Sequence, residues 1–284
     1  MRAVPIPIRS ADAEPDDTLD YMPMPREMNT FEMPRVPDPG PGTDVAGARD
    51  VLEAFVAHLD RWLAEGGDAP AVDLAGLAPD ALRVLNETLG EGEVAAIVDA
   101  AQSIRIQETV FCGVWREQHV VQGRVVHDYL LAAPVPPVVV QRAAEHASAQ
   151  LRELPLPAGA MNVPALLHEL QHAVDCSAPG VPAHVINLSL LPLSPEDNAH
   201  LDALLDGGSV VLLSRGFGNC RISSTAVRNV WRVQYFNNMQ TLILNTVEVV
   251  DVPAVAVASR EDLVEARARL DELVQWMSDS IAAA

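Results

Sequence analysis

A histidine pair with a glutamate beside it is the first feature of this sequence that could do chemistry. The segment His168-Glu169-Leu170-Gln171-His172 matches the HExxH pattern, which on a helix places two imidazoles one turn apart on one face. His168 and His172 would bind zinc, and Glu169 would activate a zinc-bound water. A catalytic zinc site needs a third protein ligand, and no HxxGxxH extension follows His172. A zinc-dependent hydrolase is therefore an alternative hypothesis, set against a structural or adventitious match on an amphipathic helix.

A glycine corner that ends in a cysteine is the second candidate. It reads Gly216-Phe217-Gly218-Asn219-Cys220-Arg221, and its two glycines allow positive φ and close backbone approach. Cys220 is either a partly exposed thiol whose thiolate Arg221 favours, or a buried cysteine after a tight turn. The third glycine and the following helix of a dinucleotide-binding fingerprint are missing.

The overall charge limits the kinds of partner. The formal net charge is −20, and no lysine occurs anywhere. A field of this sign repels nucleic acid and anionic membranes and attracts basic partners. The missing lysine excludes a P-loop lysine and pyridoxal-phosphate chemistry. Cys112, Cys176 and Cys220 form no CxxC pair, so one chain offers no four-cysteine zinc or iron–sulfur site. We expect no cofactor.

The N-terminal part differs in composition from the rest. Residues 1–44 are rich in proline, methionine and acidic residues, which predicts a disordered or extended tail. Its apolar middle contains Tyr21, Met22 and Met24, and such a segment is typical of docking into a groove, either in this protein or in a partner. The chain shows neither a secretory signal nor an apolar run of the roughly 20 residues that span a membrane. We therefore expect a cytoplasmic protein without membrane insertion.

An internal duplication follows the tail. A shift of 116 positions aligns 74–140 with 190–256 without a gap. The clearest match is Val114-Trp115-Arg116-x-Gln118 with Val230-Trp231-Arg232-x-Gln234. Further identical pairs include Gly92 and Gly208, Arg105 and Arg221, and Thr109 and Thr225. We interpret the chain as two copies of one fold, at 45–157 and 158–284, in which the tryptophans and arginines are mainly packing residues.

Each copy has the same order of predicted elements. A helix opens it, at about 46–65 and at 163–175, and a second helix begins near Pro79 or Pro195. A last helix closes each copy, and in the second it begins with the capping pattern Ser259-Arg260-Glu261-Asp262. The β-branched runs between them predict strands at 94–98, 104–110, 114–121 and 124–132, and at 210–214, 220–227, 230–236 and 241–250.

Tight hairpins are predicted at Gln122-Gly123 and at Asn237-Asn238. Because the strands of each copy are grouped between helices, we predict an α+β fold of two tandem pseudo-symmetric copies with antiparallel strands. Aromatic and amide side chains at a hairpin end are typical of a recognition surface. The candidate partner-binding residues are Gly216, Gly218, Asn219, Cys220, Arg221, Trp231, Arg232, Tyr235 and Phe236, with Tyr21, Met22 and Met24 of the tail.

The second copy resembles the HupH/HyaF hydrogenase expression proteins, a group that includes HoxQ. The resemblance rests on residues 216–225, 230–237 and 242–253, and on 21–26 in the tail. It implies a non-catalytic cytoplasmic chaperone in the maturation of an uptake nickel–iron hydrogenase. Such proteins are thought to act on the iron–sulfur small-subunit precursor before export, with a thioredoxin-like companion of the HupG/HyaE type. The small subunit carries a basic twin-arginine leader, which a chain of charge −20 would attract at low salt.

Overall fold

The structure, a computed structural model, describes residues 45–99, 103–145, 147–216 and 218–283. The first repeat contains α1 (Val45–Glu65), β1 (Ala71–Asp73), α2 (Pro79–Leu89), β2 (Val94–Val98), β3 (Ile104–Glu108), β4 (Val114–Val121), β5 (Arg124–Ala132) and α3 (Pro137–Glu145). The second contains α4 (Val163–Asp175), β6 (His184–Asn187), η1 (Leu188–Leu190), α5 (Pro195–Leu205), β7 (Val210–Ser214), β8 (Asn219–Ser224), β9 (Val230–Phe236), β10 (Leu242–Val249), η2 (Ala254–Ala256) and α6 (Arg260–Ala283). No described helix is long and apolar enough to cross a membrane.

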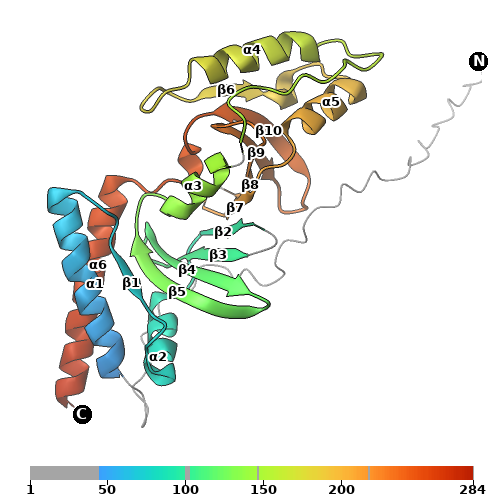
Figure 1. The fold of residues 1–284 in the computed structure, drawn as a ribbon. Helices are drawn as coiled ribbons and strands as arrows, with labels where there is room; N and C mark the ends of the chain where they lie inside the picture. The colour runs from blue at the N-terminus through green and yellow to red at the C-terminus, as the bar shows by residue number, and fades with distance from the viewer. Residues whose placement is uncertain (1–44, 100–102, 146, 217, 284) are drawn as a thin grey trace, which may run out of the picture. The chain divides into compact units, whose positions relative to one another are not determined.

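The strands of both repeats form one antiparallel sheet in the order β1-β5-β4-β3-β2-β7-β8-β9-β10-β6 (Figure 1). The repeats meet where β2 pairs with β7, and Ala96 lies opposite Leu212 in that pair. Val94 lies opposite Ser214, and Val98 opposite Val210. Since the duplication has an offset of 116, Ala96 faces its own counterpart, and a pseudo-twofold axis passes between the two. The predicted α+β fold of two pseudo-symmetric copies is confirmed.

Several residues that are identical in both repeats have a structural task. A Cβ atom on Gly92 would lie 2.1 Å from the Thr109 carbonyl oxygen, and one on Gly208 would lie 1.8 Å from that of Ser224. Only glycine permits such close backbone approach. The tryptophans are buried, and the Nε1 of Trp115 donates to the Ala133 carbonyl at 2.9 Å. The Nε1 of Trp231 donates to the carbonyls of Val250 and Asp251, both at 3.1 Å.

Alternation along the strands gives the sheet two unlike faces. The Trp face carries Trp115 and Trp231, and the Arg face carries side chains of both repeats that include Arg105, Arg116, Arg221 and Arg232. On the Trp face, a central core of buried residues includes Val139 of α3 and Ala256 of η2. On the Arg face the outer parts are covered, by α1, α2 and α6 over the first repeat and by α4 and α5 over the second.

Helix α6 belongs to the second repeat in sequence but completes the core of the first. Its buried residues Leu263, Ala266, Leu270 and Met277 pack in one cluster with residues of α1 and α2. Figure 1 shows α1 (blue) and α6 (red) side by side, although they are the first and last helices of the described chain. The predicted capping pattern is present, since Ser259 Oγ accepts from the Asp262 N–H at 3.0 Å and Asp262 accepts from the Ser259 N–H at 2.8 Å.

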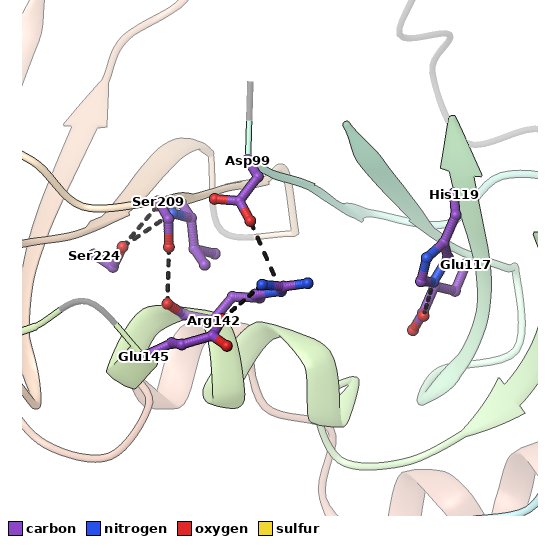
Figure 2. A network of polar contacts seen from close by, with 8 residues as sticks. Asp99, Glu117, His119, Arg142, Glu145, Ser209 and Ser224 are labelled. Carbon is purple, nitrogen blue, oxygen red and sulfur yellow. Dashed lines mark hydrogen bonds and ion pairs between the residues drawn. The ribbon is translucent and has the colours of Figure 1, made fainter. Parts of the chain in front are cut away.

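Helix α3 packs on the Trp face of the sheet at the junction between the repeats, where it contacts β2 and β7 (Figure 2). Ser209, which precedes β7, donates its hydroxyl to the Arg142 carbonyl at 2.8 Å. The Arg142 guanidinium lies 3.7 Å from Asp99 after β2 and 2.6 Å from Glu145 of its own helix. The same short helix therefore contacts both central strands.

Two features differ from the expectation. Strands β1 and β6, which form the two edges of the sheet, were not predicted, because three or four residues are too few to show an alternating pattern. The first hairpin turns at Gln122 (φ 50°) and Gly123 (φ 78°), as predicted. The second turn is longer and spans residues 237–241. There the Asn237 side chain accepts from the N–H groups of Met239 and Thr241, both at 2.9 Å, which stabilises the wider loop.

Candidate partner-binding site

The glycine corner joins β7 to β8. Gly216 and Gly218 form an isolated bridge with each other, and Gly218 has φ 98°. A Cβ atom on Gly216 would lie 2.1 Å from Oε2 of Glu93. The positive φ of Gly218 favours glycine there, whereas a side chain at Gly216 would only require the flexible Glu93 carboxylate to move.

Cys220 follows the corner and is buried, with 3% of its surface exposed. Burial raises the pKa of the Cys220 thiol to about 11, although a hydrogen bond with Tyr235 acts in the opposite direction. Burial also raises the pKa of the Tyr235 hydroxyl to about 12. A thiol of this kind is protonated at neutral pH and is a poor nucleophile. Of the two interpretations of the corner, the structure supports a tight turn followed by a buried cysteine.

The candidate residues of β8 and β9 divide between the two faces of the sheet. Side chains directly opposite each other in the register share a face, so Cys220 lies with Tyr235, and Arg221 with Gln234. Cys220, Trp231 and Tyr235 belong to the Trp face, and Asn219, Arg221, Arg232 and Phe236 to the Arg face. The members on the Arg face are all partly accessible, whereas Trp231 is 2% exposed.

The two arginines on this part of the Arg face have different surroundings. Arg232 donates from Nε to Asn245 at 2.6 Å and from Nη1 to Asp202 of α5 at 2.7 Å. Those bonds tie β9 to α5 and neutralise the charge. Arg221 has no ion pair with any residue that the structure describes, and its Nε is buried without a hydrogen-bond acceptor. Arg221 is thus a member of the predicted set whose guanidinium group has no ionic partner among the described residues. Tyr21, Met22 and Met24 lie outside the described residues.

The HExxH segment lies on α4, where His168, Glu169 and His172 are exposed and Leu170 between them is buried. Oε1 of Glu169 lies 2.9 Å from Nε2 of His184, so Glu169 pairs with β6 rather than with a site between the histidines of α4. His172 lies 3.8 Å from the Cys176 sulfur, beside a cavity of about 500 Å³ that is also lined by His184. Within the described ranges no group of three or more His, Cys, Asp or Glu side chains is placed to hold a metal ion. The geometry gives no support to the hydrolase alternative, because the third ligand is missing there.

A polar cluster on the first repeat was not predicted. His119 and Glu117 lie two residues apart on β4, and Nε2 of His119 is 2.7 Å from Oε1 of Glu117 (Figure 2). His127, opposite His119 on β5, stands edge-on to it at 5.7 Å between ring centroids and stacks on Tyr129 at 6.0 Å. The second repeat has Val233 and Tyr235 where the first has Glu117 and His119, so the cluster is specific to one copy. The predicted hairpin would have paired His119 with Val126, and a β-bulge between His119 and Val120 instead brings His119 opposite His127, so the sequence contained no clear signal of the cluster.

Comparison with known proteins agrees with this architecture. A family model described as "HupH hydrogenase expression protein, C-terminal conserved region" matches the chain twice, at residues 45–154 and 160–277. The chain is 41% identical to the hydrogenase expression/formation protein HoxQ of Cupriavidus necator over 98% of this chain and 99% of that protein. It is 34% identical to the hydrogenase-1 operon protein HyaF of Escherichia coli over 80% of this chain and 81% of that protein.

A solved structure, the hydrogenase expression protein HupH from Thiobacillus denitrificans, is 33% identical and covers 42% of this chain and 96% of its own, with a TM-score of 0.35. The double match of the family model follows the two structural repeats, and the sequence similarity extends over almost the whole chain. This chain therefore belongs to the HupH family of hydrogenase expression proteins.

Proposed function

We propose that this protein is a cytoplasmic, non-catalytic accessory factor that binds the small-subunit precursor of an uptake nickel–iron hydrogenase before export. The observation that carries the proposal is the 41% identity to a hydrogenase expression/formation protein over 98% of the chain. A thioredoxin-like companion of the HupG/HyaE type is the second expected partner. The exposed histidines of α4 and the buried, protonated Cys220 both favour binding over catalysis.

The proposed contact surface is the part of the Arg face beside the glycine corner. Asn219, Arg221 and Phe236 are partly accessible there, on neighbouring strands. Cys220, Trp231 and Tyr235 support the same strands from the Trp face and so act beneath the surface. In the tail, Tyr21, Met22 and Met24 are proposed as an additional contact with the partner.

The net charge of −20 would bring a basic leader peptide toward the protein over a long range. Such steering weakens as salt screens the charges, with a Debye length of about 10 Å at 0.1 M salt. We therefore expect the association rate with the precursor to fall with rising salt. Equal rates at low and high salt, or with the leader removed, would contradict this part of the proposal.

The proposal is tested by a tagged pull-down from hydrogenase-expressing cells, with mass spectrometry of proteins and bound metals. We expect the unprocessed small subunit and no stoichiometric zinc. Arg221→Gln should reduce recovery of the precursor, and Cys220→Ala should fold and reduce it less, because its side chain is buried. Cys176→Ala is the matched control, since Cys176 is exposed on α4's end.

Two outcomes would overturn the proposal. One is the absence of any hydrogenase subunit from the wild-type pull-down. The other is zinc near one atom per chain that is lost in a His168→Ala, His172→Ala variant, which would restore the hydrolase alternative. If both Arg221→Gln and Cys220→Ala recovered as much precursor as the wild type, the contact surface would not include β8.

A further inference from the structure

The centre of the Arg face is not covered by any described helix. Four apolar side chains meet there across the junction of the repeats, with Ala95 opposite Leu213 and Ile97 opposite Val211. Ile97 is 37% exposed, and the other three are half-buried. The pseudo-twofold axis passes through this quartet, so the two repeats present it symmetrically. An accessible apolar strip in the middle of a sheet is typical of an interaction surface.

Two symmetry-related arginines flank the apolar quartet. Arg105 lies opposite Ile97 on one side, and Arg221 lies opposite Leu213 on the other. Arg105 is exposed, and Arg221 is half-buried. Among described residues neither forms an ion pair or a side-chain hydrogen bond, and the Nε of Arg221 is buried without an acceptor. A buried donor without a partner carries a desolvation cost that a bound carboxylate would remove.

Two other arginines on the Arg face, Arg116 and Arg232, each form an ion pair with an aspartate. Arg116 binds Asp128 through two bonds of 2.7 and 2.5 Å, and Arg232 binds Asp202 at 2.7 Å. Gly92, Gly208 and the two tryptophans also have local structural reasons for being identical in both repeats. Arg105 and Arg221 have no side-chain bond to any described residue, which separates them from the glycine and tryptophan pairs and from the Arg116 and Arg232 pair.

The spacing of the two free guanidinium groups points to an extended chain. They stand three strands apart with an offset of two residues, and standard sheet spacings put their Cα atoms about 16 Å apart. Two acidic side chains four residues apart in an extended peptide lie about 13 Å apart on one face. The difference between these two distances is within the reach of the long, flexible side chains of arginine and glutamate. The residue midway between the acids points to the same face and would meet the apolar quartet.

We propose that the Arg face binds an extended acidic segment of a partner protein with the pattern acid-x-apolar-x-acid. Its two carboxylates pair with Arg105 and Arg221, and its central apolar side chain packs on Ala95, Ile97, Val211 and Leu213. The net charge of −20 strongly repels a polyanion such as nucleic acid, whereas a segment with only two carboxylates is repelled far less and meets the two arginines at contact distance. A second copy of the chain would bring the same arginines face to face. The inference does not depend on which protein is the partner, and so it goes beyond the hydrogenase proposal.

The test uses the purified full-length protein and a fluorescein-labelled peptide with the central sequence Glu-Thr-Val-Thr-Glu. Fluorescence anisotropy at about 0.15 M salt, which screens the long-range repulsion from the net charge, should show binding about tenfold tighter than that of the matched Gln-Thr-Val-Thr-Gln peptide, since charge-assisted bonds are roughly twice as strong as neutral ones. Arg105→Gln and Arg221→Gln should each weaken binding of the glutamate peptide about tenfold. Arg124→Gln, which removes an exposed arginine at the β4–β5 hairpin, should leave it unchanged.

A charge exchange makes the test independent of effects on folding. The double variant Arg105→Glu, Arg221→Glu should lose the glutamate peptide and gain a preference for Lys-Thr-Val-Thr-Lys, while its circular dichroism spectrum stays that of the wild type. Equal binding of the glutamate and glutamine peptides would overturn the proposal. So would unchanged affinity in Arg105→Gln, whose exposed side chain plays no part in packing. Both results can be obtained whether or not the protein binds a hydrogenase subunit.

Discussion

Two buried carboxyl groups show how local surroundings set the protonation of a side chain. Glu108 ends β3, where burial raises its pKa, and the N–H of Gly113 at 3.0 Å offsets only part of this effect. For Asp197 at the start of α5, burial alone would also raise the pKa. Four backbone N–H groups, those of Ser194, Val163, Asn162 and Met161, instead lower it well below its ordinary value of 3.8. Asp197 thereby satisfies the N-terminal ends of both α4 and α5.

These opposite shifts predict opposite effects of removing the two charges. Asp197 binds protons more weakly in the folded state, so its contribution is present at neutral pH and is lost as the pH falls below about 4. Asp197→Asn should therefore lower the melting temperature by several degrees at pH 7, and by less in acid. Glu108 binds protons more strongly when folded, so the cost of its charge disappears as the pH falls. Glu108→Gln should raise the melting temperature at pH 7 and lose that gain near pH 4.

Thermal unfolding followed by circular dichroism between about pH 2 and pH 8 measures both effects, because the Asp197 contribution is lost only below about pH 4. Asp206→Asn is the control, because Asp206 is exposed at the other end of α5. A loss of stability in Asp197→Asn that does not diminish in acid would show that the carboxylate acts by shape alone. The same curve for Glu108→Gln and the wild type would show that Gly113 compensates the buried charge fully.

At the scale of elements, the hydrophobic periodicity predicted the helices but not which other elements they pack against. The apolar residues of α6 recur at helical spacing, and its start was recognisable from the Ser259–Asp262 cap. Nothing in that pattern states which sheet the helix covers, and α6 lies on α1 of the other repeat. The packing depends on the path of the chain after β10, which is a property of the tertiary structure.

The position of α6 predicts that its inner face stabilises the first repeat. Leu270 is fully buried against α1 and α2, and Leu270→Ala should cost about 3 kcal/mol of unfolding free energy, because it leaves a cavity in a close-packed core. Val264→Ala on the same helix is the matched control, since Val264 is 50% exposed, and it should change stability by about 0.5 kcal/mol or less. Urea unfolding measures both values. Equal losses in the two variants would mean that the inner face of α6 contributes no more packing energy than its exposed face.

The candidate site was predictable only in part, because strand alternation divides the predicted residues between the two faces of the sheet. The corner residues and Arg221 were found from residue types, but they were expected on one surface. Strand alternation places Cys220 and Arg221 on opposite faces, which the register alone reveals. Arg105 was interpreted as structural because it is identical in both copies, yet it has no structural partner among the described residues. The two-residue spacing from Arg105 to Gln107 on a predicted strand could have placed it on the polar face.

At the scale of the whole molecule, the duplication predicted the symmetry but not where it breaks. The repeat relates Ala96 to Leu212, and the structure shows that β2 and β7 pair around these two residues. The outer cores are not equivalent, however. The buried members of the cluster under α4 and α5 all come from the second repeat, whereas the cluster under α1 and α2 includes four residues of α6. One repeat is therefore self-sufficient in its outer core, and the other is not.

This asymmetry predicts different behaviour of the two repeats when they are separated. A fragment of residues 45–157 lacks Leu263, Ala266, Leu270 and Met277, so its α1 and α2 would expose apolar surface, and it should unfold without a cooperative transition. Joining residues 259–283 to it through a flexible linker should restore cooperativity, because the added helix supplies the missing face of the core. A fragment of residues 158–258 loses the same central strand pairing, but it keeps its outer core and should unfold cooperatively. Calorimetry of the three proteins makes the comparison. Cooperative unfolding of 45–157 at the same temperature with and without the added helix would show that α6 covers a core already complete without it.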